Sequence, residues 1–325
     1  MILLAADLGG TKSNLWLFEQ DGARRRILNE ATLASADHAD ACSVVQAFLG
    51  DARVGAASVA IAGPVVNGRT ETPNLPWVVE QAGLARALGT KRVELINDLV
   101  ATAYGIAELP PDALATLNEG TPSAGTIAVI AAGTGLGEAV LVHAGGRQIA
   151  LASEGGHADF APGDEVEIEL LRHLAARHGH VSWERVVSGP GLHAIYEFLV
   201  ESGRGKRAPG LAARMKAGDP SAAIADAALA GADATASAAL DLFVRAYGSE
   251  AGNLALKVLA TGGVYVAGGI APKILSRLRA GLFLRGFLAK GRHSDLLGRM
   301  PVKVVLEPKT ALFGAARRAA ELAST

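Results

Sequence analysis

The sequence predicts an α/β protein built from two similar domains. Apolar, strand-like runs alternate with amphipathic helical segments along most of the 325 residues. A strand, a glycine turn and a returning strand occur near Leu3 and again near Ile127, which is a weak internal repeat. The length exceeds that of one ordinary α/β unit and suits two domains.

The first half of the chain predicts a hairpin followed by alternating helices and strands. We expect strands at 2–6, 15–18, 56–62 and 92–96, and helices at 40–49, 78–88 and 99–106. Gly63-Pro64 ends one buried strand, and Asn97-Asp98 ends the next. Pro110-Pro111 then marks a domain boundary, because a proline pair interrupts regular structure.

The second half repeats the theme and adds a mostly helical block. We expect strands at 126–132, 139–142, 148–152, 264–267 and 301–305, helices through 164–260, and a last helix at 310–322. The basic, glycine-rich stretch 203–210 predicts a solvated surface loop. The predicted domains are 1–109 plus 306–325, and 110–305.

Composition narrows the class of protein. Half of the residues are hydrophobic, so a sizeable core is available and disorder is not expected. The net charge of −1 gives no general attraction to nucleic acid or to an anionic membrane. The single cysteine, Cys42, excludes an internal disulfide and suits a reducing cytoplasm. The N-terminus has no basic segment, and Asp7 interrupts its apolar stretch, so we expect no signal peptide.

Three glycine-rich turns each follow a buried strand. The first is Gly9-Gly10-Thr11-Lys12 after Asp7, where backbone amides, a hydroxyl and an ammonium suit a phosphate and the aspartate suits hydrated Mg²⁺. Alone, this turn is equally typical of an ordinary hairpin. The second is the turn 133–137, and the third is 267–269. Together they predict a nucleotide held between two domains.

The common nucleotide-binding motifs are missing. No P-loop motif and no protein-kinase motif set occurs. The stretch 133–137 reads G-x-G-x-G, and a strand-like segment follows it where a dinucleotide-binding fold needs a helix. The expected phosphate site is therefore of a different kind.

Asn97-Asp98 lies where a strand becomes a helix. Asp98 is a good helix N-cap that would bond first-turn amides. It would also lie at the carboxyl end of a sheet, where it could take a proton from a substrate hydroxyl while Asn97 orients a neighbouring hydroxyl. One residue can serve in both ways.

The segment Glu154-Gly155-Gly156-His157 is the polar motif that most strongly indicates a ligand site. Its glycines permit a sharp bend that aims a carboxylate and an imidazole at one small object, such as the vicinal hydroxyls of a sugar. A zinc site is disfavoured because spaced ligand partners are lacking. His178 and His180 are expected in a solvated turn, and Glu184 near the start of a short helix.

These motifs, taken in order, resemble those of the bacterial glucokinases, a branch of the actin-like ATPase and sugar-kinase superfamily. The resemblance covers the whole chain and rests on the stretches 7–11, 96–98, 133–137, 154–162, 179–192 and 268–272. It implies two actin-like (ribonuclease H-like) α/β domains around a cleft. It also implies transfer of a phosphoryl group from ATP to the 6-hydroxyl of glucose.

The resemblance assigns roles residue by residue. Asp98 matches the general base, and Asp7 is placed to hold Mg²⁺ through water. Glucose ligands are implied at Asn74, Asn97, Asp98, Glu154, His157 and Glu184. Nucleotide contacts are implied at Gly9, Gly10, Thr11, Lys12, Gly133, Thr134, Gly135, Gly268 and Gly269. The family also suggests a homodimer.

One departure and several alternatives remain. Lys12 stands where many members of this branch carry Asn, as in the related repressor and kinase family, but the cysteine-rich zinc motif of that family is missing here. A kinase for N-acetylglucosamine, mannose or fructose, or one that uses polyphosphate, stays open. A sugar-sensing repressor is disfavoured, because the chain begins at the phosphate turn without a DNA-binding segment.

Overall fold

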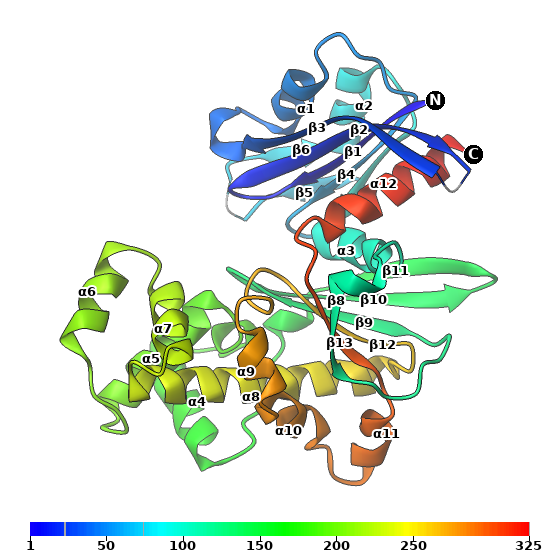
Figure 1. Ribbon diagram of the computed structural model, residues 1–325. Coiled ribbons are helices and arrows are strands. Elements are labelled where there is room, and N and C mark those ends of the chain that lie inside the picture. Colours follow the sequence, from blue (N-terminus) through cyan, green and yellow to red (C-terminus); the bar gives the residue numbers. More distant parts are fainter. Residues whose placement is uncertain (23, 74, 325) are drawn as a thin grey trace. The chain divides into compact units, whose positions relative to one another are not determined.

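The computed structural model describes residues 1–22, 24–73 and 75–324. The chain divides into two units. Unit 1 contains 1–113, 139–152 and 307–325, and unit 2 contains 114–138 and 153–306 (Figure 1). The predicted domains, 1–109 plus 306–325 and 110–305, stay a prediction.

Unit 1 is built on a five-stranded sheet of order β3-β2-β1-β4-β7. The hairpin strands pair antiparallel, whereas β1, β4 and β7 run parallel. Its elements are β1 (Ile2–Leu8), β2 (Lys12–Asp21), β3 (Arg24–Ala34), α1 (Ala41–Leu49), β4 (Ala56–Ile61), β5 (Arg69–Glu71), β6 (Val78–Glu80), α2 (Gln81–Leu88), β7 (Val93–Asn97), α3 (Asp98–Ile106) and α12 (Thr310–Ala323).

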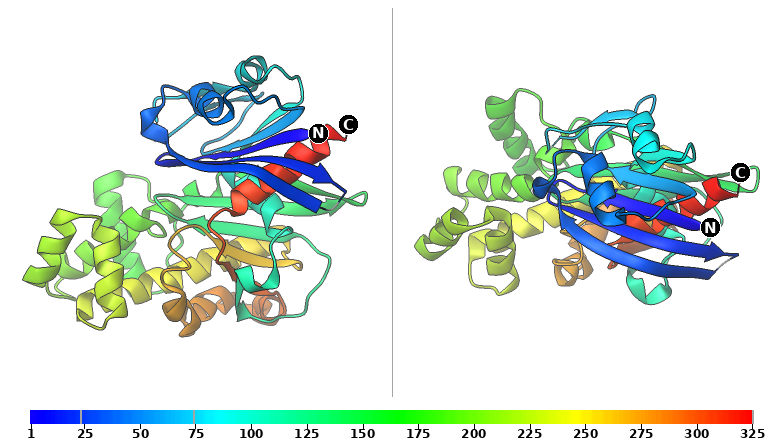
Figure 2. Two further views of the ribbon diagram at one scale, coloured as in Figure 1. Left: turned by 45° about the horizontal axis from the view of Figure 1, so that its top comes forward. Right: turned by 90° about the horizontal axis from the view of Figure 1, so that it is seen from above.

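Both faces of this sheet are covered. Alternate residues of β1 point to opposite faces, so Leu4 enters a core with α1 and α2 while Leu3 enters a core with α12. Figure 2 shows the last helix, in red, on one side of this sheet and helices α1 and α2 on the other. Helices α3 and α12 approach closely at Gly105 and Gly314, where an added Cβ would overlap the backbone of the other helix. The buried strands therefore read as continuous apolar runs.

The second sheet has the order β11-β10-β9-β12-β13-β8, with β9, β12 and β13 parallel; most of its strands belong to unit 2, but residues 139–152, which form most of β10 and β11, are grouped with unit 1. The buried helix α8 contributes the largest share of its core. The elements are β8 (Leu114–Asn118), β9 (Ile127–Ala132), β10 (Leu136–Ala144), β11 (Arg147–Ser153), α4 (Glu165–His178), α5 (Gly189–Glu201), α6 (Pro209–Ala217), α7 (Pro220–Leu229), α8 (Ala234–Val258), β12 (Gly263–Ala267), α9 (Leu275–Arg279), α10 (Leu282–Leu288), α11 (Ser294–Gly298) and β13 (Val302–Val305).

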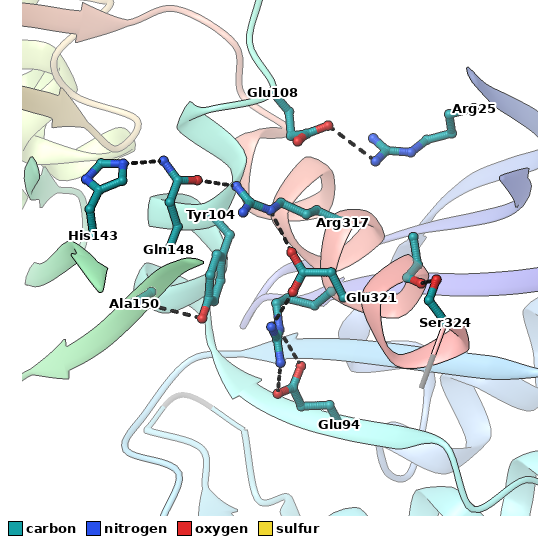
Figure 3. Close-up of polar contacts among 12 residues, drawn as sticks. Arg25, Glu94, Tyr104, Glu108, His143, Gln148, Ala150, Arg317, Glu321 and Ser324 are labelled. Carbon is teal, nitrogen blue, oxygen red and sulfur yellow. Dashed lines mark hydrogen bonds and ion pairs between the residues drawn. The ribbon is translucent and has the colours of Figure 1, made fainter. Parts of the chain in front are cut away.

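A polar network explains why 139–152 groups with unit 1. The Tyr104 hydroxyl of α3 accepts a hydrogen bond from the Ala150 amide at 3.1 Å, and Arg317 of α12 donates to Gln148 at 2.6 Å (Figure 3). Next to them, Arg318 donates to both carboxylate oxygens of Glu94, at 2.8 and 2.9 Å, and its guanidinium lies over the Tyr104 ring. The bidentate geometry fixes the last helix to β7.

Most predicted elements are found, and the differences concern four strands that were not predicted, β3, β5, β6 and β8. The predicted helix 78–88 begins at Gln81, because Val78–Glu80 is strand β6. Strand β3 was not predicted, since its arginines and exposed apolar residues show no buried face. Strand β8 was not predicted either. Among the described residues no single helix is long and apolar enough to span a membrane. Helices α7 and α8, which are joined at a sharp bend, reach the necessary length and apolarity only when taken together.

Candidate functional site

In unit 1 the predicted site residues share one edge of the sheet. Leu8, Ile61 and Asn97 lie in register across the parallel strands β1, β4 and β7. The turn 9–12, Gly63 and Asp98 therefore follow the carboxyl ends of three adjacent strands. Ligands of parallel α/β sheets bind at this edge.

The first glycine turn is held by its own backbone and by Ser35. The Gly9 amide donates to the Lys12 carbonyl at 3.0 Å, and a Cβ on Gly9 would lie 2.9 Å from that oxygen. Ser35 donates from its hydroxyl to Gly9 O at 2.7 Å and from its amide to Thr11 O at 3.0 Å. The carbonyls are thus bonded inward, while Thr11 and Lys12 are exposed. This arrangement suits a turn that presents donors to an anion.

Asp7 lies at the end of β1, just before this turn. Burial raises the pKa of its carboxyl to about 6, and a hydrogen bond with Asn14 acts in the opposite direction. A divalent cation nearby would offset the cost of burying the charge. Among the described residues no three acidic, His or Cys side chains gather as a metal cluster. Asp7 therefore fits a Mg²⁺ ion that takes its other ligands from water and phosphate.

Asn97, and not Asp98, is the N-cap of α3. Its Oδ1 accepts from the amides of Leu99 and Val100 at 2.8 and 3.2 Å, and its Nδ2 donates to Gly63 O at 3.1 Å. Both acceptor sites are thus used, and among the described residues one N–H has no acceptor and can serve a ligand. Asp98 is the first helical residue, and its Oδ1 also accepts from Leu99, at 2.9 Å. The helix N-terminus favours a negative charge there.

In unit 2 two glycine turns follow adjacent parallel strands. Ala131 of β9 lies in register with Ala267 of β12, so the turns at 133 and 268 leave the same edge. Gly268 has φ +83°, and a Cβ there would overlap the backbone of Ala132. Only glycine meets both conditions. The Gly133 amide donates to Gly135 O at 2.8 Å, which closes the second turn.

The Glu154–His157 segment and the segment around Glu184 form one cluster. Each contains a single-turn 3-10 helix, η3 (Gly155–His157) and η4 (Trp183–Arg185). The Trp183 amide donates to Ala158 O at 3.0 Å, and Phe160 packs edge-on against Trp183 with ring centroids 4.9 Å apart. Buried aromatic packing thus joins two segments that are far apart in the sequence.

Two carboxylates flank the His157 ring. His157 Nε2 lies 4.0 Å from Glu154 Oε2, and His157 Nδ1 lies 3.9 Å from Glu184 Oε1. A hydroxyl oxygen between such a pair can reach both partners at hydrogen-bond distance. The side chains of Glu154 and His157 are 58% and 59% exposed, so they are available to a ligand. His180 instead pairs with Asp159 at 2.8 Å and stays outside the cluster.

The cluster is continuous with the second glycine turn. Glu184 Oε2 accepts from the Leu136 amide at 2.9 Å, and a Cβ on Gly135 would overlap that carboxylate. The expected sugar ligands and the expected phosphate turn of unit 2 are therefore in contact. The predicted ligand Asn74 lies outside the described residues.

Sequence reasoning missed one notable residue, Glu138 of β10. Its carboxyl is buried (1% exposed) and packs directly against Gly155, where a Cβ would overlap it. Burial, and then the neighbouring Glu250, raise the pKa of Glu138 to about 8. The available signal was a lone acidic residue inside the apolar run 136–142.

Comparisons with known proteins bear on this arrangement. The sequence model of the glucokinase family matches residues 4–322. A glucokinase of Nostoc sp. is 44% identical over 341 aligned residues, with 99% of each chain covered. The chain belongs to the glucokinase family.

Solved structures agree with this membership. The crystal structure of a glucokinase from an Antarctic psychrotroph superposes with a TM-score of 0.86 at 31% identity, covering 98% of this chain and 99% of that one. A ROK family glucokinase from Streptomyces griseus, solved with glucose and AMPPNP, shares the fold at a TM-score of 0.66 and 22% identity, covering 99% and 100%. The predicted fold class, two actin-like α/β domains, is confirmed.

Proposed function

We propose that this glucokinase-family protein transfers the γ-phosphoryl group of ATP to the 6-hydroxyl of glucose. Besides the family membership, one observation carries the proposal. The Glu154–His157–Glu184 cluster is built onto the glycine turn at 133–137. A group that recognises hydroxyls and a turn suited to phosphate are thus parts of one structure.

The proposed roles follow the chemistry of each side chain. Glu154 and Glu184 accept hydrogen bonds from sugar hydroxyls, His157 donates or accepts, and Asn97 donates through its remaining N–H. Asn74 is proposed as a further ligand by resemblance only. Asp98 takes the 6-hydroxyl proton as the oxygen attacks the γ-phosphorus and ADP leaves in line.

The glycine turns are proposed to bind the nucleotide. Amides of the turns at 9–12 and 133–135, with Thr11, Lys12 and Thr134, bind phosphate oxygens, and Gly268 and Gly269 contact the adenosine. Asp7 would hold Mg²⁺ through water, and the ion would spread the charge that develops on the phosphate.

A panel of sugars and phosphoryl donors tests the proposal. Initial rates are measured with glucose, N-acetylglucosamine, mannose and fructose, each with ATP or polyphosphate, and the product is identified by NMR. We expect glucose with ATP to give the highest kcat/KM, because a pocket of paired hydrogen bonds discriminates strongly against altered hydroxyls. A higher kcat/KM with another sugar, or with polyphosphate, would replace the assignment.

The proposal includes a homodimer that works in the cytoplasm with small-molecule partners only, not nucleic acid or membranes. Light scattering on the purified full chain measures the mass against the 33.2 kDa monomer. Fractionation of the cells that make the protein tests its location.

A further inference from the structure

Two buried carboxyl groups lie beneath the predicted sugar-binding turn of unit 2. Glu138 on β10 packs against Gly155, and Glu250 on α8 is fully buried beside it. Each has one oxygen, Oε1, without a hydrogen-bond partner among the described residues. This pair has no part in the mechanism above, and buried acidic pairs are uncommon enough to need an explanation.

The charged surroundings of the pair are unequal. Glu250 accepts from Asn253 Nδ2 at 2.8 Å and lies 3.5 Å from Lys257 Nζ, and the Lys290 charge also acts on it. Glu138 faces Glu250, Lys257, the buried Tyr247 hydroxyl, and the turn that carries Glu154 and His157. The titratable and charged groups that act on the two carboxyls are therefore Tyr247, Lys257 and Lys290.

This inequality decides which carboxyl keeps a proton. Two adjacent carboxylates in a low-dielectric interior do not both ionise at neutral pH. Burial raises the pKa of both carboxyls, but Glu250 has the cations and the amide that lower its pKa, so of the two it carries the negative charge. The pKa of Glu138 is raised to about 8 by burial first and by Glu250 second, so Glu138 is protonated at pH 7 and donates a hydrogen bond to Glu250.

We propose that the protonated Glu138–Glu250 pair positions the turn Glu154–His157, and that loss of the Glu138 proton weakens sugar binding. Glu138 acts through Gly155 and is a positioning residue. The inference rests on the proposed function, since it concerns the same sugar site.

The physical reason is the contact with Gly155. The neutral Glu138 carboxyl packs against the Gly155 Cα without needing water, and its O–H donates to the Glu250 carboxylate. A carboxylate in that place is desolvated and repelled by Glu250, so it is stabilised by moving toward water. Gly155 blocks that movement and must shift with it. Because Glu154 is adjacent in sequence and His157 is two residues away, the hydroxyl ligands shift too.

The experiment is a pH titration of glucose affinity. Dissociation constants are measured by calorimetry without nucleotide from pH 7 to 9.5, alongside kcat and KM with ATP. In the wild type we expect the dissociation constant and KM to rise roughly fivefold or more across the titration of one coupled proton, with a much smaller change in kcat. A flat dissociation constant across this range overturns the inference.

Variants identify the group responsible. Glu138→Gln keeps a donor to Glu250 and cannot ionise, so its glucose affinity should stay near the wild-type value at pH 7 and be independent of pH. Glu167→Gln is the matched control: it removes another buried carboxylate of unit 2, 3% exposed, that pairs with Arg245, and it should keep the wild-type profile. A rise that persists in Glu138→Gln overturns the inference.

A second pair of variants covers the case in which Glu138→Gln does not fold. Glu250→Gln removes the neighbouring charge and should lower the pH midpoint, whereas Lys257→Gln removes a cation and should raise it. If the pH midpoint of glucose affinity is the same in both variants as in the wild type, the inference is overturned. If the wild type binds no glucose at pH 7, the proposed function fails; if it binds glucose without pH dependence, only this inference fails.

Discussion

The two units present their candidate ligands in different ways. In unit 1 the side chain of Asn97 makes three hydrogen bonds to backbone groups, and Asp98 bonds the Leu99 amide. In unit 2 Glu154 and His157 are more than half exposed, and their turn is closed by a backbone bond from the His157 amide to Glu154 O at 3.0 Å. Asn97 and Asp98 of unit 1 thus support the fold, whereas the side chains of Glu154 and His157 in unit 2 are left available for a ligand.

The difference has a local cause. A helix that begins at the sheet edge leaves amides without partners, and Asn97 and Asp98 supply the acceptors. In the short helix η3 the Ser153 hydroxyl accepts from the Gly155 amide at 3.0 Å, and the Glu154 side chain makes no capping bond. Truncating Asn97 should therefore lower stability, whereas truncating Glu154 or His157 should lower sugar affinity; Asp98, which bonds a backbone amide and is also the proposed base, tests whether one residue can serve both purposes.

The largest effect is expected at Asp98. Asp98→Asn keeps the shape and the acceptor for the Leu99 amide but removes the base. We expect kcat to fall by about a hundredfold or more while the protein stays folded, since general base catalysis contributes at this level. Steady-state kinetics and circular dichroism check the two halves of the statement. Near-normal turnover in the folded variant would leave Asp98 as a helix-terminus residue only.

Next in size is the loss of the sugar ligands of unit 2. Glu154→Ala and His157→Ala should each weaken glucose binding by about 2–4 kcal/mol, because hydroxyls buried in the complex lose a partner. The KM for ATP should change far less. His180→Ala is the matched control, since His180 pairs with Asp159 outside the cluster and should bind glucose normally. Normal calorimetric affinity in both test variants would move the sugar site elsewhere.

A smaller effect separates the two units directly. Asn97→Ala removes a helix cap and leaves the Gly63 carbonyl without its donor, so the free energy of unfolding should fall by about 1–2 kcal/mol. His157→Ala, at an exposed position, should change it by less than about 0.5 kcal/mol. Denaturant unfolding without sugar measures both. Equal losses of unfolding free energy in the two variants would show that Asn97 supports the fold no more than His157 does.

Burial also determines which strands could be predicted from the sequence. The strands at Leu3, Ala56 and Ile127 are continuous apolar runs, so their prediction is confirmed. Strand β3 lies at the sheet edge and none of its residues is buried, so its own hydrophobic periodicity does not reveal its pairing with β2. An edge strand is specified by its neighbour, which a single sequence window does not show.

The site shows the same limit. Glycine turns and helix starts are local, so the sequence placed the residues at strand ends correctly. The sequence suggested Asp98 as the N-cap of α3, whereas the N-cap is Asn97. The two differ by one position, and a helix start cannot be predicted that closely from sequence. The meeting of Glu138 with Gly155 and Glu250 depends on packing between β10, η3 and α8, and no spacing in the chain encodes it.

The last prediction concerns Asp7, whose burial opposes the fold. A carboxyl with a pKa of about 6 in the folded state, above its ordinary value of 3.8, binds its proton more tightly when folded. Its contribution to stability therefore falls as the pH rises from about 4 to 6, and the deficit persists above pH 6. Asp7→Asn removes this deficit and keeps an acceptor for Asn14. We expect the metal-free variant to melt a few degrees above the wild type at pH 8, with a smaller difference at pH 5.

The proposed Mg²⁺ contact gives the opposite sign in the presence of nucleotide. Ionised Asp7 gains a cation when Mg²⁺ and ATP bind, so the wild type should be stabilised more than Asp7→Asn by the same ligand concentration. Differential scanning fluorimetry at pH 5 and pH 8, with and without Mg²⁺-ATP, measures all four differences. An equal gap in melting temperature at both pH values would show that the Asp7 charge costs the fold nothing. An equal gain on adding Mg²⁺-ATP would remove Asp7 from the metal site.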